Sequence, residues 1–129
     1  MKSNFTYTGI RVRDMDRSIR FYTEGLGTEL LDRRKVPRTG GENADLATPG
    51  SDRVLEFNWY PRKGMVKEYR KGDEMAHMAF GMESVTNAIE HLGRHCARMT
   101  VEPFHEAGSW VAFVADPDRI WIELLSKEP

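Results

Sequence analysis

The segment 119–125, Arg-Ile-Trp-Ile-Glu-Leu-Leu, carries one carboxylate, Glu123, among apolar neighbours. The β-branched and aromatic residues around it favour a strand. Successive side chains of a strand point to opposite faces, so Trp121, Glu123 and Leu125 share one face. An ionised glutamate in so apolar a strand is costly unless a cation or several donors meet it. We therefore expect other parts of the chain to supply that partner.

A turn must position this strand. Asp116-Pro117-Asp118 stands directly before it. Pro117 presets φ for a turn, and aspartate side chains can accept hydrogen bonds from nearby backbone N–H groups. The segment 119–126 is thus predicted to be the last strand of the chain.

The remaining elements form one pattern twice, β-α-β-β-β. In the first half, Asp14 is a predicted helix N-cap, and in the second half Ser84 is the cap and Gly93 the predicted end of the helix. The predicted strands are 5–12, 29–36, 44–48 and 53–60, then 75–82, 97–102, 110–115 and 119–126. Residues 104–109 are predicted to form a loop.

The repeat brings four positions into equivalence. A shift of 70 residues places Tyr7 on His77, and a shift of 67 places Glu56 on Glu123. Alternation directs these four side chains to the sheet face opposite the helices. Two carboxylates and an imidazole that converge there suit a divalent metal of intermediate hardness, such as Zn, Ni, Mn, Co or Fe(II).

Simpler interpretations exist for each of these residues. Glu56 could pair with Arg11 or Arg53 across the sheet, and His77 could be a hydrogen-bonded structural residue. Arg11 also shares a face with the site, as do Asn58 and Trp121. These side chains could hold a carboxylate, an amide and an apolar part of a substrate.

Composition narrows the functional class. The 129 residues carry a net charge of −1 and a single cysteine, Cys96. Neither a basic patch typical of nucleic-acid binding nor a run long enough to span a membrane is present. The lone cysteine excludes an internal disulfide and fits a reducing compartment. We expect a cytoplasmic protein that acts on a small molecule.

The chain resembles the glyoxalase I / bleomycin resistance / extradiol dioxygenase superfamily, which has the vicinal oxygen chelate fold. The resemblance rests on segments 10–22, 26–27, 55–57, 76–80 and 113–125. It implies an α+β fold made of two βαβββ modules, each a curved mixed sheet with its helix on the outer face. We expect one domain over residues 1–129, with module 1 at about 4–60, a linker at 61–73 and module 2 at about 74–127.

The resemblance also implies metal ligands. Glyoxalase I-like enzymes place His, Glu, His and Glu on the four equivalent strands. Glu56, His77 and Glu123 match three of these positions, and Tyr7 stands where the family has its first histidine. A neutral phenol, with an unperturbed pKa of about 10, is a poor ligand.

A metal-dependent glyoxalase I-like lyase or isomerase is therefore the expected function. Such an enzyme converts the hemithioacetal of a 2-oxoaldehyde and a thiol into a 2-hydroxyacyl thioester, the lactoylglutathione lyase reaction. The metal stabilises the enediolate; Glu123 takes one proton, and a carboxylate such as Glu56 or a water returns it. The alternatives are a related epimerase or extradiol dioxygenase, and a metal-free binding protein of the bleomycin-resistance kind. The resemblance also implies that the chain forms a homodimer, as the family's small members do.

Overall fold

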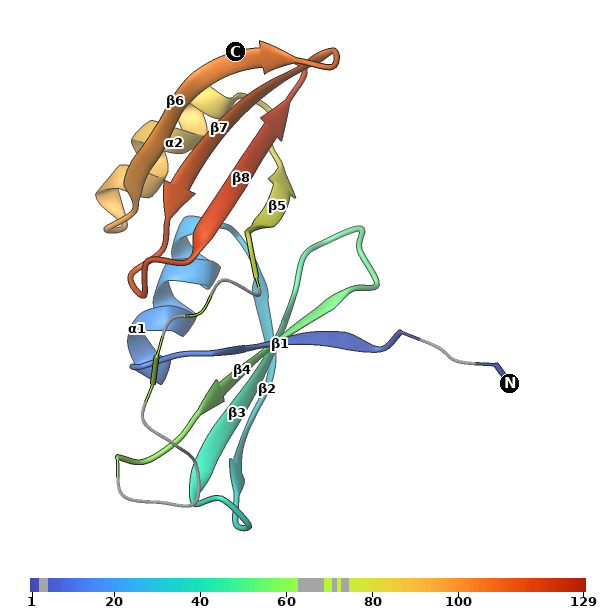
Figure 1. The fold of residues 1–129 in the computed structure, drawn as a ribbon, viewed down its shortest axis with the longest axis vertical. Coiled ribbons are helices and arrows are strands. Elements are labelled where there is room, and N and C mark those ends of the chain that lie inside the picture. Colours follow the sequence, from blue (N-terminus) through green and yellow to red (C-terminus); the bar gives the residue numbers. More distant parts are fainter. Residues whose placement is uncertain (3–4, 63–68, 71, 73–74) are drawn as a thin grey trace. The chain divides into compact units, whose positions relative to one another are not determined.

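The computed structural model describes residues 1–2, 5–62, 69–70, 72 and 75–129. These residues form two compact units, 1–70 and 71–129, and each holds its own four-stranded sheet (Figure 1). Most of the predicted linker 61–73 lies outside the described residues.

The first unit follows the predicted module. Its elements are β1 (Tyr7–Arg11), α1 (Met15–Arg20), η1 (Phe21–Gly25), β2 (Glu29–Val36), β3 (Gly41–Ala47) and β4 (Val54–Trp59). The strands lie in the order β1-β4-β3-β2. β1 is parallel to β4 and the other pairs are antiparallel, so the sheet is mixed.

The second unit repeats this topology. Its elements are β5 (Met78–Gly81), α2 (Val85–Arg94), β6 (Arg98–Glu106), β7 (Ser109–Ala115) and β8 (Trp121–Ser126). The order is β5-β8-β7-β6, again with a parallel first pair and antiparallel neighbours. The predicted α+β fold with two βαβββ modules is confirmed.

Side-chain caps begin both helices where the sequence predicts them. The Asp14 side chain accepts a hydrogen bond from the Arg17 backbone N–H at 3.0 Å, and Ser84 accepts one from Asn87 at 3.2 Å. Each bond satisfies a backbone donor that the first helical turn leaves free. None of the helices in the described part of the chain is both long and apolar enough to cross a bilayer.

Each helix covers one face of its own sheet. In the first unit, the fully buried Tyr22 ring lies edge-on to Phe57 of β4, with 4.9 Å between the centroids. In the second unit α2 packs on β6, β7 and β8, and Leu92 of the helix is buried, as are Ile122 and Leu124 of β8. Because neighbours along a strand alternate, Glu56 and Glu123 point away from the helices.

Several predicted boundaries are wrong. β3 begins at Gly41 rather than at residue 44, β5 begins at Met78 rather than at residue 75, and two further differences change where the chain turns. Residues 104–109 are not a loop, because β6 continues to Glu106 and a turn of two residues, Ala107 and Gly108, joins it to β7. Both turn residues have positive φ, 48° and 77°, as a tight hairpin requires. Nor does α2 end at Gly93: it continues to Arg94, and Cys96 adopts the positive φ of 69° that turns the chain.

Candidate functional site

A polar surface lies on the open face of the first sheet. In the strand register, Glu56 of β4 lies between Gly9 of β1 and Asp45 of β3. A Cβ atom at Gly9 would lie 3.1 Å from the side-chain nitrogen of Asn58 and 3.7 Å from the Tyr7 ring. Tyr7, Asn58 and Glu56 therefore lie on the same face, around a glycine that leaves them room.

Glu56 is held by residues that the sequence analysis missed. Arg34 of β2 donates from Nη2 to Glu56 Oε2 at 2.9 Å, and Asn43 of β3 donates to Oε1 at 3.3 Å. The predicted pairing of Glu56 with Arg11 or Arg53 is not what the structure shows. The Arg11 guanidinium instead lies over the Tyr60 ring, 5.1 Å from its centroid, and Arg53 approaches Asp52 at 3.6 Å.

Arg34 stands among three carboxylates. Its Nη1 atom lies 3.0 Å from Asp32 Oδ2 and 3.1 Å from Asp45 Oδ2, while Nη2 contacts Glu56. Burial raises the pKa of the Glu56 carboxyl above its usual value and the Asp45 carboxylate raises it further, although Arg34 opposes both effects. The cluster around Arg34 thus holds three carboxylates and a single guanidinium, so it carries more negative charge than Arg34 balances.

The second unit brings His77 and Glu123 together. His77 Nε2 lies 3.2 Å from Glu123 Oε2. β5 begins at Met78, later than predicted, so His77 stands just before the strand; in the register Ala79 pairs with Glu123. The Glu123 side chain is 21% exposed and that of His77 is 39% exposed, so both can be reached from solvent.

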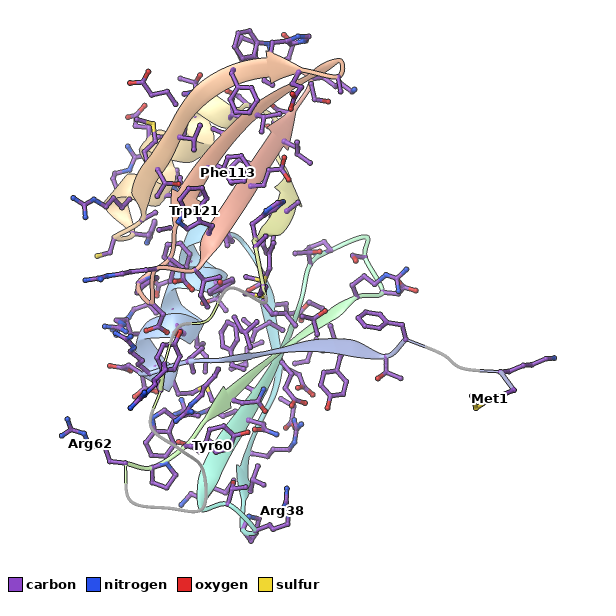
Figure 2. The ribbon with its side chains drawn as sticks, viewed as in Figure 1. Met1, Arg38, Tyr60, Arg62, Phe113 and Trp121 are labelled. Carbon is purple, nitrogen blue, oxygen red and sulfur yellow. The ribbon has the colours of Figure 1, made fainter. Side chains whose placement is uncertain are left out.

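Aromatic side chains line this pair. The Phe113 ring lies edge-on to the His77 imidazole at 5.3 Å and 5.8 Å from the Trp121 ring (Figure 2). Trp121 is 41% exposed, which is high for so large an apolar ring. An imidazole, a carboxylate and an open aromatic surface therefore lie side by side in the second unit.

The donor types suit a divalent metal. Imidazole nitrogen and carboxylate oxygen are ligands for divalent metals of intermediate hardness. In the first unit, Glu56 already contacts a cationic side chain, that of Arg34. Within either unit, the described residues bring together no three His, Cys, Asp or Glu side chains that could hold a metal ion. The three predicted ligands belong to different units, Glu56 to the first and His77 with Glu123 to the second.

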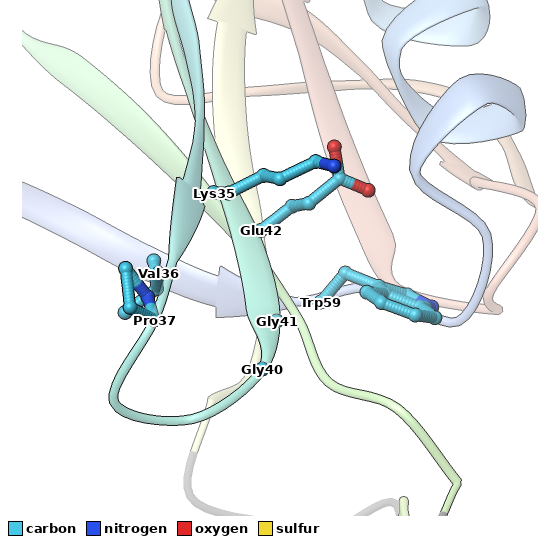
Figure 3. Close-up of a pocket in the computed structure, with 7 residues that line it drawn as sticks. All are labelled: Lys35, Val36, Pro37, Gly40, Gly41, Glu42 and Trp59. Atoms are coloured by element: carbon cyan, nitrogen blue, oxygen red, sulfur yellow. The ribbon is translucent and has the colours of Figure 1, made fainter.

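A pocket of about 400 Å³ lies elsewhere on the first unit. Its lining includes Lys35, Glu42 and Trp59 (Figure 3). By register these three residues share the face of Phe57, on the helix side of the sheet, whereas Glu56 points to the other side. The pocket thus contains no predicted site residue.

The chain is similar to known proteins over nearly its whole length. A family model described as the Glyoxalase/Bleomycin resistance protein/Dioxygenase superfamily matches residues 4–124. The lactoylglutathione lyase of Salmonella typhimurium is 32% identical over 128 residues, which cover 92% of this chain and 89% of that protein. The Arabidopsis thaliana protein named lactoylglutathione lyase GLX1 is 33% identical over 129 residues, 97% of this chain. The chain spans less than half of that plant relative, 44%.

Solved structures give the same result. The trypanothione-dependent glyoxalase I of Leishmania major has a TM-score of 0.79 and 34% identity to this chain, and the match covers 98% of this chain and 88% of the other. The predicted resemblance is confirmed by both sequence and fold.

Proposed function

The chain belongs to the glyoxalase/bleomycin resistance protein/dioxygenase superfamily, and we propose from this premise that it is a metal-dependent lyase or isomerase of the glyoxalase I type. Its substrate would be a hemithioacetal, or another small molecule with two adjacent oxygens. The observation that carries the proposal is the His77–Glu123 pair, 3.2 Å apart and partly open to solvent. Relatives named lactoylglutathione lyase support the class of reaction.

Glu56, His77 and Glu123 would hold the metal, one of Zn, Ni, Mn, Co and Fe. When bound, such a metal supplies Lewis acidity to the adjacent substrate oxygens. The two glutamates differ in their surroundings: the Glu56 side chain is only 9% exposed and already paired, whereas that of Glu123 is 21% exposed. We assign Glu123 the removal of a proton from a substrate carbon, because a base must reach that proton. Glu56, which is held more firmly, is the candidate carboxylate for returning the proton.

The remaining residues would bind the substrate. Trp121 with Phe113 offers an apolar surface next to Glu123. In the first unit, Arg11 lies over the Tyr60 ring as a cation suited to a carboxylate. Tyr7 and Asn58 add a hydroxyl and an amide on the face that carries Glu56.

A metal-free binding protein is the second candidate, and two observations favour it. Arg34 already neutralises Glu56, and Tyr7 stands in the place of the family's first histidine. A chain with this arrangement could bind an organic ligand on the aromatic surface without a metal. Metal content after purification separates the two functions, because stoichiometric metal is expected only for the enzyme.

The experiment combines metal binding with turnover. Wild type and His77→Ala are stripped with a chelator, titrated with Zn²⁺ and Ni²⁺ in a calorimeter, and assayed with the hemithioacetal of methylglyoxal and glutathione. His77→Ala should bind metal at least about tenfold more weakly, because it lacks one of the three proposed ligands. A tenfold change in affinity corresponds to about 1.4 kcal/mol of binding free energy. His105→Ala is the matched control, because His105 packs on Trp110 of β7 at 5.5 Å, outside the proposed ligand set.

Glu123→Gln tests the proton transfer. An amide cannot serve as a base, so turnover should fall by about 10²–10⁴-fold, while Glu102→Gln, an exposed change on β6, should keep wild-type turnover. Equal turnover in the two variants would remove Glu123 from the mechanism. Absence of metal binding in wild type would instead support the metal-free function.

We further propose that the chain acts as a homodimer in the cytoplasm. The edge strand β2 exposes Leu30 and Leu31, at 40% and 53%, and apolar side chains on a free edge favour association. The reducing compartment rests on the single cysteine.

A further inference from the structure

Arg34 contacts three carboxylates through two different nitrogens. Nη1 contacts Asp32 and Asp45 at 3.0 and 3.1 Å, and Nη2 alone contacts Glu56, at 2.9 Å. The guanidinium is therefore anchored by one nitrogen while the other makes the bond to Glu56. Loss of the Glu56 contact would leave the Nη1 anchor intact.

Asp45 has an acceptor to spare. Its Oδ1 atom is buried and finds no hydrogen-bond partner among the described residues. Asp45 lies opposite Glu56 in the register of β3 against β4. The free oxygen therefore belongs to a residue adjacent to the Arg34–Glu56 hydrogen bond. A buried carboxylate oxygen without a donor is costly, and two parallel bonds from one guanidinium to one carboxylate are favourable.

We propose that Arg34 is an internal counter-ion that occupies Glu56 in the metal-free protein and releases it when a metal binds. On release, Nη2 turns from Glu56 to the free Oδ1 of Asp45 and completes a two-bond pair with that residue. This inference rests on the proposed metal-dependent function. Arg34 is then a positioning residue, which acts through Glu56 and is not itself a metal ligand.

The exchange leaves Glu56 paired with a cation in both states. Glu56 is nearly buried, with a side chain 9% exposed, and a buried unpaired carboxylate is strongly unfavourable. Arg34 neutralises it until the metal does. The Arg34 side chain is 40% exposed, so its end has room to turn, and Asp32 and Asp45 keep it close.

The test measures metal affinity in chelator-treated protein. Wild type, Arg34→Gln and Arg34→Lys are titrated with Zn²⁺ by calorimetry. The control is Arg33→Gln, which removes the same charge from the adjacent residue of β2; Arg33 pairs with Asp16 and Glu42 instead. Arg34→Gln should bind Zn²⁺ about tenfold more tightly than wild type, equivalent to about 1.4 kcal/mol, and Arg33→Gln should stay within about twofold.

Arg34→Lys separates competition from simple charge repulsion. An ammonium keeps the positive charge but lacks the fork that spans Asp45 and Glu56. It should therefore bind Zn²⁺ more tightly than wild type, as Arg34→Gln does. Wild-type affinity in Arg34→Lys, beside tight binding in Arg34→Gln, would overturn the inference, because charge alone would then explain the gain. This variant also gives a result if the glutamine variant does not fold.

The remaining outcomes distinguish this inference from the proposed function. If wild type binds Zn²⁺ and Arg34→Gln matches Arg33→Gln, the inference is wrong and the metal-dependent function stands. If Arg34→Gln binds Zn²⁺ and wild type does not, Arg34 occupies Glu56 without releasing it, and both the inference and the metal-dependent function of the natural chain are overturned. If none of the proteins binds, both are overturned.

Discussion

The Asp116 side chain should contribute strongly to stability, because the turn between two strands depends on it. It lies in the turn between β7 and β8 and is 4% exposed. Its Oδ1 atom accepts hydrogen bonds from the backbone N–H groups of Asp118 and Ile120, both at 2.8 Å. These bonds hold a turn in which Arg119 has a positive φ of 67°, so the start of β8 depends on them.

Asp116→Ala removes both bonds. A hydrogen bond to a charged group contributes about 1.5–3 kcal/mol, so the variant should lose about 3–6 kcal/mol of the free energy of unfolding. A domain of this size has only about 5–15 kcal/mol. With an m value of about 1.5 kcal/mol/M, a loss of 3 kcal/mol lowers the urea midpoint by about 2 M. The measurement is urea unfolding followed by circular dichroism.

Two further variants make the result specific. Asp116→Asn keeps an acceptor oxygen but loses the charge, and should cost about half as much, because charge-assisted bonds are about twice as strong as neutral ones. Asp52→Ala removes an aspartate from another turn, where the side chain is 94% exposed, and should change stability by less than about 0.5 kcal/mol. If Asp116→Ala and Asp52→Ala unfold at the same urea concentration, the side chain does not support the turn.

Two other predictions concern the proposed function. Tyr7→His should tighten Zn²⁺ binding by completing the family's set of four ligands. Tyr7→Phe should leave the affinity within about twofold of wild type, since three ligands remain. Calorimetry of both variants beside wild type is the measurement, and equal affinities of the two variants would place position 7 outside the metal site. Sedimentation equilibrium at micromolar concentration should give the mass of two chains, and Leu31→Lys should shift the protein toward the monomer because it charges an exposed edge; a single-chain mass for wild type at every concentration would exclude the dimer.

Local rules predicted much of the fold. The caps at Asp14 and Ser84 and the bounds of β2 follow from single residues and short patterns, and the structure has them in place. The turn at Asp116 follows from the ability of a short carboxylate side chain to bond nearby backbone. Because the same pattern occurs twice, the topology of one half supported that of the other.

The larger error occurred where sheet pairing outweighed a local pattern. The predicted strand ended at Glu102, just before Pro103, and proline removes a ladder hydrogen bond. The sheet accommodates it with a register shift between Val101 and Phe104, and β6 continues to Glu106. Gly93 resembled a helix end, yet one more residue of α2 forms. The continuation of β6 depends on its pairing with β7, which a local pattern does not contain.

The candidate site shows the same limit at one residue. Strand β2 carries the charged run from Asp32 to Lys35. Because all four residues are charged, the alternation of side chains alone does not show which of them face Glu56. The register of β2 against β3 shifts between Leu30 and Asp32. Leu30 pairs with Leu46 on the helix side; without the shift, the even-numbered residues that follow, Arg34 among them, would lie on that side too.

With the shift, Arg34 pairs with Asn43 and so faces Glu56, while Arg33 points to the helix side, where it meets Asp16. One extra residue in a strand therefore decides which of two adjacent arginines neutralises the buried carboxylate. Sequence alternation could place Glu56 on the correct face because β4 is regular. Its counter-ion could not be predicted, because the identity of that residue depends on a bulge that only the pairing of two strands defines.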